Sequence, residues 1–333
     1  MPLLLDNTTP NRAMARVLPA GTRLCNGAYE VQALLGAGSF GAVYRAQDTR
    51  SGGTLALKTE PLECATPQLA IEYAVLTTAL RHKEGLPEAK WVGHCAATQL
   101  KVLAMPLLGA SVEALRAASA GALPLPLHVV QYVATQTLER LRACHEEHVA
   151  HRDLKPENLV FESGGVPEVA EALLRRAGAA PGAGGGAAER PARRRPPRVF
   201  LIDFGLCKVV RDPKTGAHIP LLTDKRLAGT PRFASLAAHR GLEQSRRDDL
   251  ESLLYVLLFL ARNRLPWEGL GAAAGASDDN FAAIADVKER LPPAELCAGL
   301  PPAFALTLEH ARALAFEDMP NYTLLLRWWS VPM

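Results

Sequence analysis

The strongest constraint on the fold is a change in hydrophobic pattern partway along this chain of 333 residues. From Tyr29 to about Leu103 the apolar residues form short runs rich in strand formers, with one helical stretch among them. After Gly109 they recur at a helical period, in the stretches 127–144, 248–262 and 303–316. The sequence therefore predicts an α+β fold, in which a small β-rich lobe with one helix precedes a larger helical lobe.

Within the β-rich part, two strand-like runs flank the glycines at 36, 38 and 41, and a third run ends at Lys58. Thr66 and Pro67 form a helix start signal, an N-cap followed by proline at the first helical position. We expect a helix from there to about Leu80.

The expected domain boundaries follow from these patterns. Residues 1–23 carry little pattern and are expected to be a flexible extension. Residues 24–329 are expected to form one domain. Its parts are an N-lobe at 24–105, a hinge at 106–109 and a C-lobe at 110–329.

A low-complexity insertion covers residues 163–197, which are mostly Gly, Ala, Pro and Arg. Such a composition buries too little apolar area to offset its ordering entropy, so we expect most of it to be disordered. A short helix from Val166 to Arg176 is compatible with the sequence. The run Arg193–Arg195 is most simply a solvated patch, and a nuclear-localisation or docking role is the alternative.

Composition excludes several classes of protein. The net charge of +3 is too small to indicate nucleic acid as the main partner. The six cysteines are scattered without metal-ligand spacing, which is typical of a reduced protein of the cytoplasm, the nucleus or both. The N-terminus resembles neither a secretory signal nor a myristoylation site. The most apolar segment, Leu253–Leu260, is far shorter than the roughly 20 residues of a membrane span, so it predicts a buried helix.

The segment His151–Asn158 reads HRDLKPEN and carries the residue types needed for phosphoryl transfer. It matches the catalytic-loop pattern of protein kinases without a substitution. In that pattern Asp153 accepts the proton of a substrate hydroxyl, and Asn158 holds a magnesium ion. Lys155 resembles the version found in serine/threonine kinases.

The glycines at 36, 38 and 41, followed by Val43, fit a loop that covers the phosphates of ATP. Glycine lets the backbone approach phosphate oxygens closely because it has no Cβ. Lys58 matches the lysine that pairs with the α- and β-phosphates. Its ammonium requires a carboxylate, for which Glu60, Glu63 and Glu72 are near in sequence. Glu72 is the preferred candidate because it lies inside the expected helix.

The tripeptide Asp203–Gly205 follows an apolar strand and reads DFG, the metal-binding motif. Asn158 and Asp203 are both oxygen donors, which suits Mg²⁺. The motifs together predict a site for ATP and Mg²⁺ in which charge stabilisation dominates catalysis.

Between Gly229 and Gly269 the chain reads GTPRFASLAAHRGLEQSRRDDLESLLYVLLFLARNRLPWEG, and here it closely resembles the casein kinase 1 family. The EQSRRDDLES run and the LPW tripeptide carry the resemblance, and tau-tubulin and vaccinia-related kinases fit less well. The resemblance covers about residues 24–329 outside the insertion. It implies a monomeric serine/threonine kinase acting on protein substrates with Ser or Thr acceptors.

The resemblance also assigns the remaining site residues. Met105 matches the gatekeeper, and the hinge offers the carbonyl of Pro106 and the amide of Leu108 to adenine. Asp249 matches an aspartate that braces the catalytic loop. Arg232 and Lys225 match residues that bind a phosphate or acidic group upstream of the target hydroxyl. The apolar walls around the base match Leu35, Val43, Ala56, Val160 and Ile202.

The chain departs from the family at three places. Residues 271–280 are neutral to acidic where the family has a basic cluster, which weakens the case for phospho-primed substrates. Ala237 and Ala114 replace an asparagine and an aspartate found in many members. None of these positions belongs to the phosphoryl-transfer machinery.

Two other functions stay open at this stage. A kinase-fold scaffold would act by binding, but such proteins usually lose the equivalents of Lys58, Asp153 or Asp203, which this chain retains. A small-molecule kinase fits less well, because Lys155 and the GTPRFAS segment resemble kinases that act on proteins. We also expect activity that requires no activation-loop phosphate, and Cys207 as a small buried residue rather than a reactive thiol.

Overall fold

The protein is described from a computed structural model, over residues 17–38, 41–64, 67–119, 124–174, 197–270 and 278–333. Its contacts divide it into two compact units. The first comprises the described residues of 1–70 together with 89–107. The second comprises 71–88 and the described residues of 108–333.

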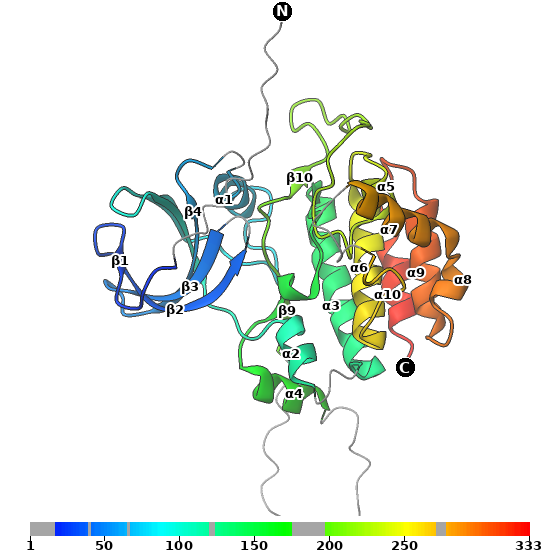
Figure 1. Ribbon diagram of the computed structural model, residues 1–333, viewed down its shortest axis with the longest axis horizontal. Helices are drawn as coiled ribbons and strands as arrows, with labels where there is room; N and C mark the ends of the chain where they lie inside the picture. The colour runs from blue at the N-terminus through cyan, green and yellow to red at the C-terminus, as the bar shows by residue number, and fades with distance from the viewer. Residues whose placement is uncertain (1–16, 39–40, 65–66, 120–123, 175–196, 271–277) are drawn as a thin grey trace, which may run out of the picture. The chain divides into compact units, whose positions relative to one another are not determined.

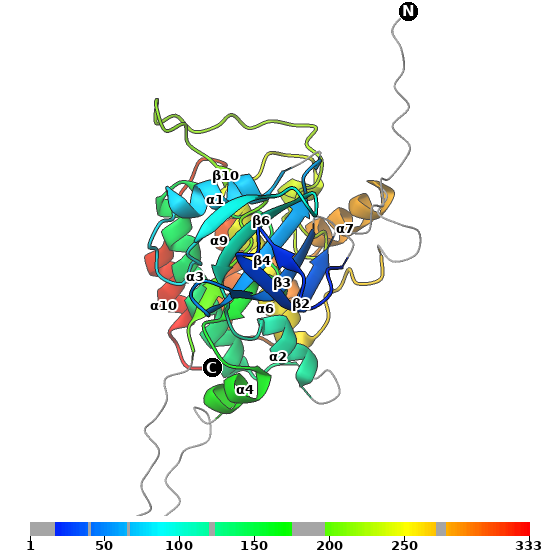
Figure 2. The same ribbon diagram turned by 90° about the vertical axis from the view of Figure 1, so that its left-hand side faces the viewer.

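The first unit is built on one antiparallel sheet of six strands in the order β1-β2-β3-β4-β6-β5. Figure 2 looks onto β2, β3, β4 and β6 of this sheet. The strands are β1 (Arg23–Leu24), β2 (Tyr29–Gly38), β3 (Gly41–Asp48), β4 (Thr54–Pro61), β5 (Trp91–Cys95) and β6 (Leu100–Pro106).

Side chains alternate between the two faces of this sheet because successive residues of a strand point in opposite directions. One face carries the core of the unit, to which β3, β4 and β6 contribute Tyr44, Leu57 and Val102, all at most 1% exposed. The residues that alternate with them, such as Val43 and Lys58, therefore lie on the opposite face. The predicted β-rich unit is confirmed.

Helices dominate the second unit, and α6 (Arg246–Arg262) lies at its centre (Figure 1). It packs against α3 (Leu127–Glu146) and α9 (Pro302–Ala313). The segment Leu253–Leu260 is buried on all sides, as expected for a central helix that is apolar all round. Ser245 and Asp248 form a capping box at the start of α6, and Asn263 ends it in the left-handed conformation.

The other helices of the second unit are short. They are α2 (Val112–Ala118), the 3₁₀ turn η1 (Pro156–Asn158), α4 (Val166–Leu174), α5 (Leu236–His239), α7 (Asp278–Arg290), α8 (Pro293–Leu296) and α10 (Tyr322–Trp329). Two small antiparallel pairs complete the unit, β7 (Val149–Ala150) with β10 (Lys208–Val209) and β8 (Leu159–Phe161) with β9 (Val199–Leu201). Within the described ranges, no helix is both long and apolar enough to cross a membrane.

The helix expected from Thr66 to Leu80 is shorter than predicted. Helix α1 runs from Leu69 to Thr77, and Thr66 lies outside the described residues. Glu60 of β4 provides the cap, since its Oε2 accepts the backbone N–H groups of Gln68 at 2.9 Å and Leu69 at 3.2 Å. A carboxylate at a helix N-terminus satisfies unpaired donors and complements the helix dipole. The cap comes from a strand, so a local signal did not reveal it.

The other helix predictions agree with the structure within a few residues. The stretches 127–144, 248–262 and 303–316 correspond to α3, α6 and α9. In the insertion, the helix expected from Val166 is present as α4. Residues 175–196, where most of the expected disorder falls, lie outside the described part of the chain.

Candidate active site

The centre of the candidate site is the carboxylate of Asp153, a residue that is only 7% exposed. Each of its oxygens accepts a hydrogen bond from a side chain of the second unit. Lys155 Nζ donates to Oδ2 at 2.6 Å, and Thr230 Oγ1 donates to Oδ1 at 2.8 Å. These contacts fix the orientation of a carboxylate that sequence analysis assigns as the catalytic base.

Asp249, in the first turn of α6, braces the loop that carries Asp153. Its Oδ2 accepts the backbone N–H of His151 and its Oδ1 that of Arg152, both at 2.7 Å. The brace expected from the sequence is confirmed. It holds Arg152 in the left-handed region, at a φ of 69°, where a residue with a side chain is strained.

A buried chain of hydrogen bonds supports Asp249 in turn. His145 Nε2 lies 2.9 Å from Asp249 Oδ2, and Tyr322 Oη lies 2.7 Å from His145 Nδ1. Burial lowers the pKa of His145 and raises that of Tyr322. A neutral imidazole then donates to Asp249 through Nε2 and accepts the tyrosine O–H at Nδ1. Burial would raise the pKa of Asp249, but the hydrogen bonds from His145 and from the backbone of Arg152 lower it, which keeps the carboxylate ionised.

The two predicted metal ligands are brought together by backbone hydrogen bonding. Ile202 donates its N–H to the carbonyl of Asn158 at 3.0 Å, so Asp203 follows directly after this contact. The side-chain nitrogen of Asn158 donates to the carbonyl of Asp153 at 2.9 Å. This contact leaves the amide oxygen of Asn158 as the ligand atom. Asp203 adopts a φ of 68°, an uncommon conformation that re-aims the chain after β9.

This donor set fits Mg²⁺. One amide oxygen and one carboxylate are hard ligands, and Mg²⁺ typically takes few protein ligands while it keeps waters and substrate phosphates. Across the described residues, no cluster of three or more His, Cys, Asp or Glu side chains is placed to hold a metal ion. Asn158 and Asp203 would hold the ion, which supplies positive charge to the phosphate oxygens when bound.

The three glycines of the predicted phosphate loop differ in what surrounds them. A Cβ at Gly36 or Gly38 would meet no atom within 4 Å among the described residues. A Cβ at Gly41 would lie 1.8 Å from the carbonyl oxygen of Thr59 in β4. Packing of β3 on β4 thus requires glycine at 41, whereas the open space at 36 and 38 fits a loop that a phosphate group approaches. Ser39 and Phe40, between them, lie outside the described residues.

The sheet of the first unit gathers several predicted ATP contacts on one face. Val43 lies opposite Lys58, and Ala56 lies opposite Met105. Since Ala56 and Lys58 are two residues apart on β4, all four share the face away from the core. Leu35 is exposed on β2 beside a bulge, and Pro106 ends β6.

In the second unit, Val160 and Ile202 lie close to the predicted metal ligands. Val160 lies on β8, two residues after Asn158, and is 7% exposed. Ile202 follows β9, and its carbonyl oxygen lies 3.0 Å from His151 Nε2. Leu108, the predicted hinge donor, is half-buried and is the first residue of the segment 108–333 of the second unit.

The three carboxylates considered for Lys58 have distinct surroundings. Glu60 is 2% exposed and is occupied by the α1 cap and by Lys101 Nζ at 3.3 Å. Glu63 is exposed. Glu72 is fully buried in α1, and its Oε1 accepts the backbone N–H of Phe204 at 3.1 Å. Glu72 therefore contacts the DFG segment, and its pairing with Lys58 stays a prediction.

Arg232 and Lys225 face different carboxylates. Arg232 Nε lies 3.7 Å from Glu268 Oε1, and its side chain is 49% exposed. Lys225 Nζ lies 3.4 Å from Glu243 Oε2. The two predicted anion ligands thus contribute to separate ion pairs, so the sequence-based expectation of a shared role stays a prediction.

Sequence reasoning missed the part played by Glu243, which is 1% exposed. Its carboxylate lies 2.7 Å from Lys208 Nζ and 3.4 Å from both Arg152 Nη1 and Lys225 Nζ. Burial would raise the pKa of Glu243, but the hydrogen bond from Lys208 and the surrounding positive charges lower it. One buried carboxylate is therefore the shared partner of three cationic side chains beside the catalytic loop. Glu243 is the first residue of the EQS triplet, which the family resemblance had marked without assigning it a role.

Cys207 matches its expectation as a structural residue. It is 6% exposed, and burial raises the pKa of its thiol to about 12. A protonated, buried thiol is a poor nucleophile.

Comparison with protein families is consistent with this geometry. The model described as the protein kinase domain matches residues 29–292. The match covers most of the chain and includes the glycine-rich loop, Lys58, Asp153, Asn158 and Asp203. Together with the β-rich unit and the helical unit, it shows the bilobal α+β kinase fold. The chain belongs to the protein kinase domain family.

Proposed function

We propose that this protein is a serine/threonine kinase of the casein kinase 1 type. It would transfer the γ-phosphate of ATP, with Mg²⁺, to hydroxyl groups of protein substrates that carry acidic or phosphorylated residues. The family implies ATP use and typically a divalent metal. The finer assignment is supported by Lys155 and by the GTPRFAS and EQSRRDDLES segments.

One observation carries the proposal: both oxygens of Asp153 have a positioned donor, from Lys155 and Thr230. A substrate hydroxyl that hydrogen-bonds this carboxylate would be oriented for attack, and Asp153 would take its proton as the phosphoryl group transfers. Lys155 places a positive charge next to the same carboxylate, where it could offset negative charge on the phosphoryl oxygens during transfer.

The surroundings of Glu243 support activity without an activation-loop phosphate. In kinases that require such a phosphate, new arginine–phosphate pairs order the activation loop. Here a carboxylate of the chain itself already pairs with Arg152, Lys208 and Lys225. The buried Glu243 carboxylate thus already gives this cationic cluster an anionic partner within the folded protein, which supports ordering without an added phosphate.

The test is phosphorylation of casein by the purified chain with Mg²⁺ and γ-labelled ATP, followed by phosphoamino-acid analysis. We expect label on serine and threonine, and none with the variants Asp153→Asn and Lys58→Met. A protein that binds ATP normally but labels neither itself nor casein would rule out the proposed activity and favour the scaffold alternative. Label found only on tyrosine would contradict the serine/threonine assignment.

A further inference from the structure

Lys288, in the last turn of α7, is 0% exposed, although Glu289 and Arg290 beside it are exposed. A lysine ammonium is costly to bury unless hydrogen bonds and counter-charges compensate for the lost water. Its surroundings therefore indicate what the residue does.

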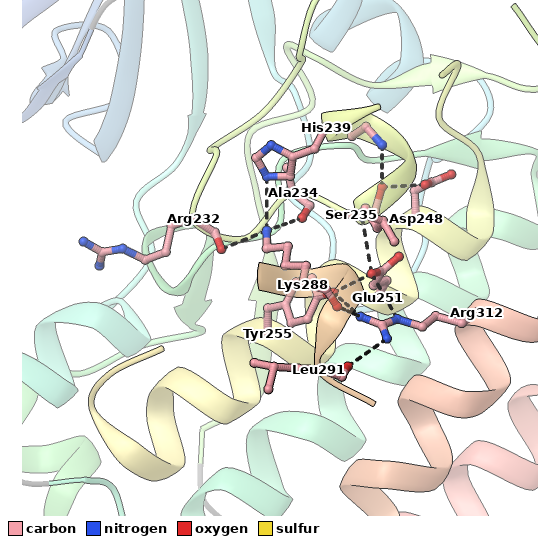
Figure 3. A network of polar contacts seen from close by, with 12 residues as sticks. Arg232, Ala234, Ser235, His239, Asp248, Glu251, Tyr255, Lys288, Leu291 and Arg312 are labelled. Atoms are coloured by element: carbon pink, nitrogen blue, oxygen red, sulfur yellow. Dashed lines mark hydrogen bonds and ion pairs between the residues drawn. The ribbon is translucent and has the colours of Figure 1, made fainter. Parts of the chain in front are cut away.

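The ammonium of Lys288 is enclosed by backbone carbonyls of one short segment (Figure 3). Its Nζ donates to the carbonyl oxygen of Ala234 at 2.7 Å. The carbonyl oxygens of Pro231 and Arg232 lie at 3.3 Å and 3.4 Å. The side-chain nitrogen of Lys288 thus contacts three of the four carbonyls in the segment 231–234.

Aromatic rings complete the enclosure. The Nζ of Lys288 lies 4.7 Å from the ring centroids of both Tyr255 and Trp267, the distance of a cation–π contact. Trp267 also donates its Nε1–H to the carbonyl of Arg232 at 2.8 Å. His239 Nε2 lies 3.2 Å from Lys288 Nζ. Burial, and then the charge of Lys288, lower the pKa of His239 to about 4, so its ring is neutral and adds no opposing charge near pH 7.

The last turn of α7, which carries Lys288, is held in place by hydrogen bonds from α9. Arg312 of α9 donates to the carbonyl of Lys288 at 2.7 Å and to that of Leu291 at 3.3 Å. Its Nε lies 3.7 Å from Glu251 Oε1 of α6. The backbone of Lys288 is therefore held in place by contacts with α9 and, through Arg312, with α6. This fixes the position from which its side-chain nitrogen reaches the carbonyls of residues 231–234.

The segment held by Lys288 joins two parts of the candidate site. On one side, Thr230 donates to Asp153. On the other, Ser235 caps α5 and donates to Asp248 at 2.6 Å. Arg232 lies between them, and Figure 3 shows its side chain extending away from Lys288 while its carbonyl turns toward the ammonium. The Arg232 guanidinium lies 5.2 Å from the ring centroid of Phe259, the distance of a cation–π contact.

We propose that Lys288 is a positioning residue that fixes the backbone of residues 231–234, so that Arg232 presents its guanidinium to an acidic or phosphorylated residue of a protein substrate. This inference rests on the proposed function. It assigns substrate discrimination to a buried side chain that need not touch the substrate.

The test compares wild type with Lys288→Met, which keeps the length and apolar stem of the side chain but removes its N–H donors. Arg290→Met is the matched control, because it removes an exposed cation from the same turn. Each protein is assayed on three peptides that differ only before the target serine: one neutral, one acidic and one with phosphoserine.

In Lys288→Met we expect kcat/KM on the preferred acidic or phosphorylated peptide to fall about 10- to 100-fold, the range for loss of a hydrogen bond from a charged group. The neutral peptide should lose less, so the discrimination ratio should fall toward that of Arg232→Gln. The KM for ATP should not change. Combining Lys288→Met with Arg232→Gln should reduce discrimination no further than Arg232→Gln alone, because the two residues act as one unit.

The outcomes separate the two proposals. If wild type phosphorylates none of the peptides, or shows no preference among them, the proposed function or its substrate class fails. If wild type discriminates and Lys288→Met discriminates equally well, the role of Lys288 is wrong. Should Lys288→Met not fold, Trp267→Phe decides, since it removes the N–H donated to Arg232 and keeps an aromatic ring beside Lys288. Reduced discrimination in that variant supports the inference, and unchanged discrimination overturns it.

Discussion

Thr230 donates its hydroxyl to Oδ1 of Asp153 at 2.8 Å, although the two residues are 77 positions apart in the chain. The contact ties the segment before α5 to the proposed catalytic base. A change in that segment can therefore reach the carboxylate through one hydroxyl group.

Replacing Thr230 tests this link. Thr230→Val keeps the shape of the side chain but removes the donor, so Oδ1 of Asp153 loses its hydrogen bond from Thr230. We expect kcat for peptide phosphorylation to fall about tenfold, the effect of a hydrogen bond worth roughly 1 to 2 kcal/mol. Thr230→Ser retains the hydroxyl and should keep most of the activity. Equal activity of the valine and serine variants would show that Asp153 needs no orientation from Thr230.

Glu243 offers a test of the proposal that activity requires no activation-loop phosphate. Glu243→Gln removes the negative charge that pairs with Arg152, Lys208 and Lys225, and leaves those cations close together. We expect kcat to fall at least about tenfold and thermal stability to fall, because a buried charge pair is broken from one side. Phosphatase treatment of wild type should leave its activity unchanged. Activity lost on that treatment would mean that an added phosphate, rather than Glu243, orders the cluster.

Gly229 tests how tightly the catalytic loop is packed. It adopts a φ of 94°, and a Cβ there would lie 2.3 Å from the carbonyl oxygen of Arg152. Gly229→Ala therefore combines backbone strain with a clash, and we expect it to destabilise the fold or displace the loop, with activity reduced more than tenfold. Gly216→Ala is the control in a thermal melt and activity assay, since its φ is also positive but no described atom lies within 4 Å of its Cβ. Similar losses in both variants would attribute the effect to backbone conformation alone.

Lys288 should give stability a distinctive pH dependence. Burial lowers its pKa from 10.5 to about 7, against the opposing charge of Glu251 and with a smaller contribution from the charge of Arg312. Between those values the unfolded chain binds a proton at this site that the folded protein lacks. The free energy of unfolding therefore rises with pH, by about 1 kcal/mol per pH unit from this group.

The measurement is the difference in unfolding free energy between wild type and Lys288→Met, from about pH 5 to about pH 10. As pH rises, the free energy of unfolding of wild type should increase relative to that of the variant. Below pH 7 the difference should be constant, because Lys288 is then protonated in both the folded and the unfolded state. A flat difference over the whole range would mean that the three carbonyls and two rings hold the ammonium charged.

The motifs of this chain made its chemistry predictable because they are contiguous. His151–Asn158, Asp203–Gly205 and the glycine-rich loop each need fixed spacing along a single turn or hairpin, so their residues are readable without a fold. The strongly apolar α6 was predictable for a related reason, since a helix buried on all sides leaves no polar stripe.

Contacts between distant segments could not be predicted in this way. The cap of α1 is the side chain of Glu60, eight residues before the first amide that it accepts, so a local N-cap rule put the helix start too early. Lys288 lies in a charged helix end, where the sequence indicates an exposed residue. Only packing against Tyr255 and Trp267 makes that position a buried one.

The unequal surroundings of the three loop glycines have a consequence for how the motif tolerates variation. Alanine at 41 would collide with Thr59 in every molecule, so a screen that selects only for soluble expression should eliminate it. Alanine at 36 or 38 should survive that screen and be lost only when growth or survival depends on nucleotide turnover. The glycines of this one motif are thus required for two different reasons. Packing of the sheet requires Gly41, whereas the approach of the nucleotide would require Gly36 and Gly38.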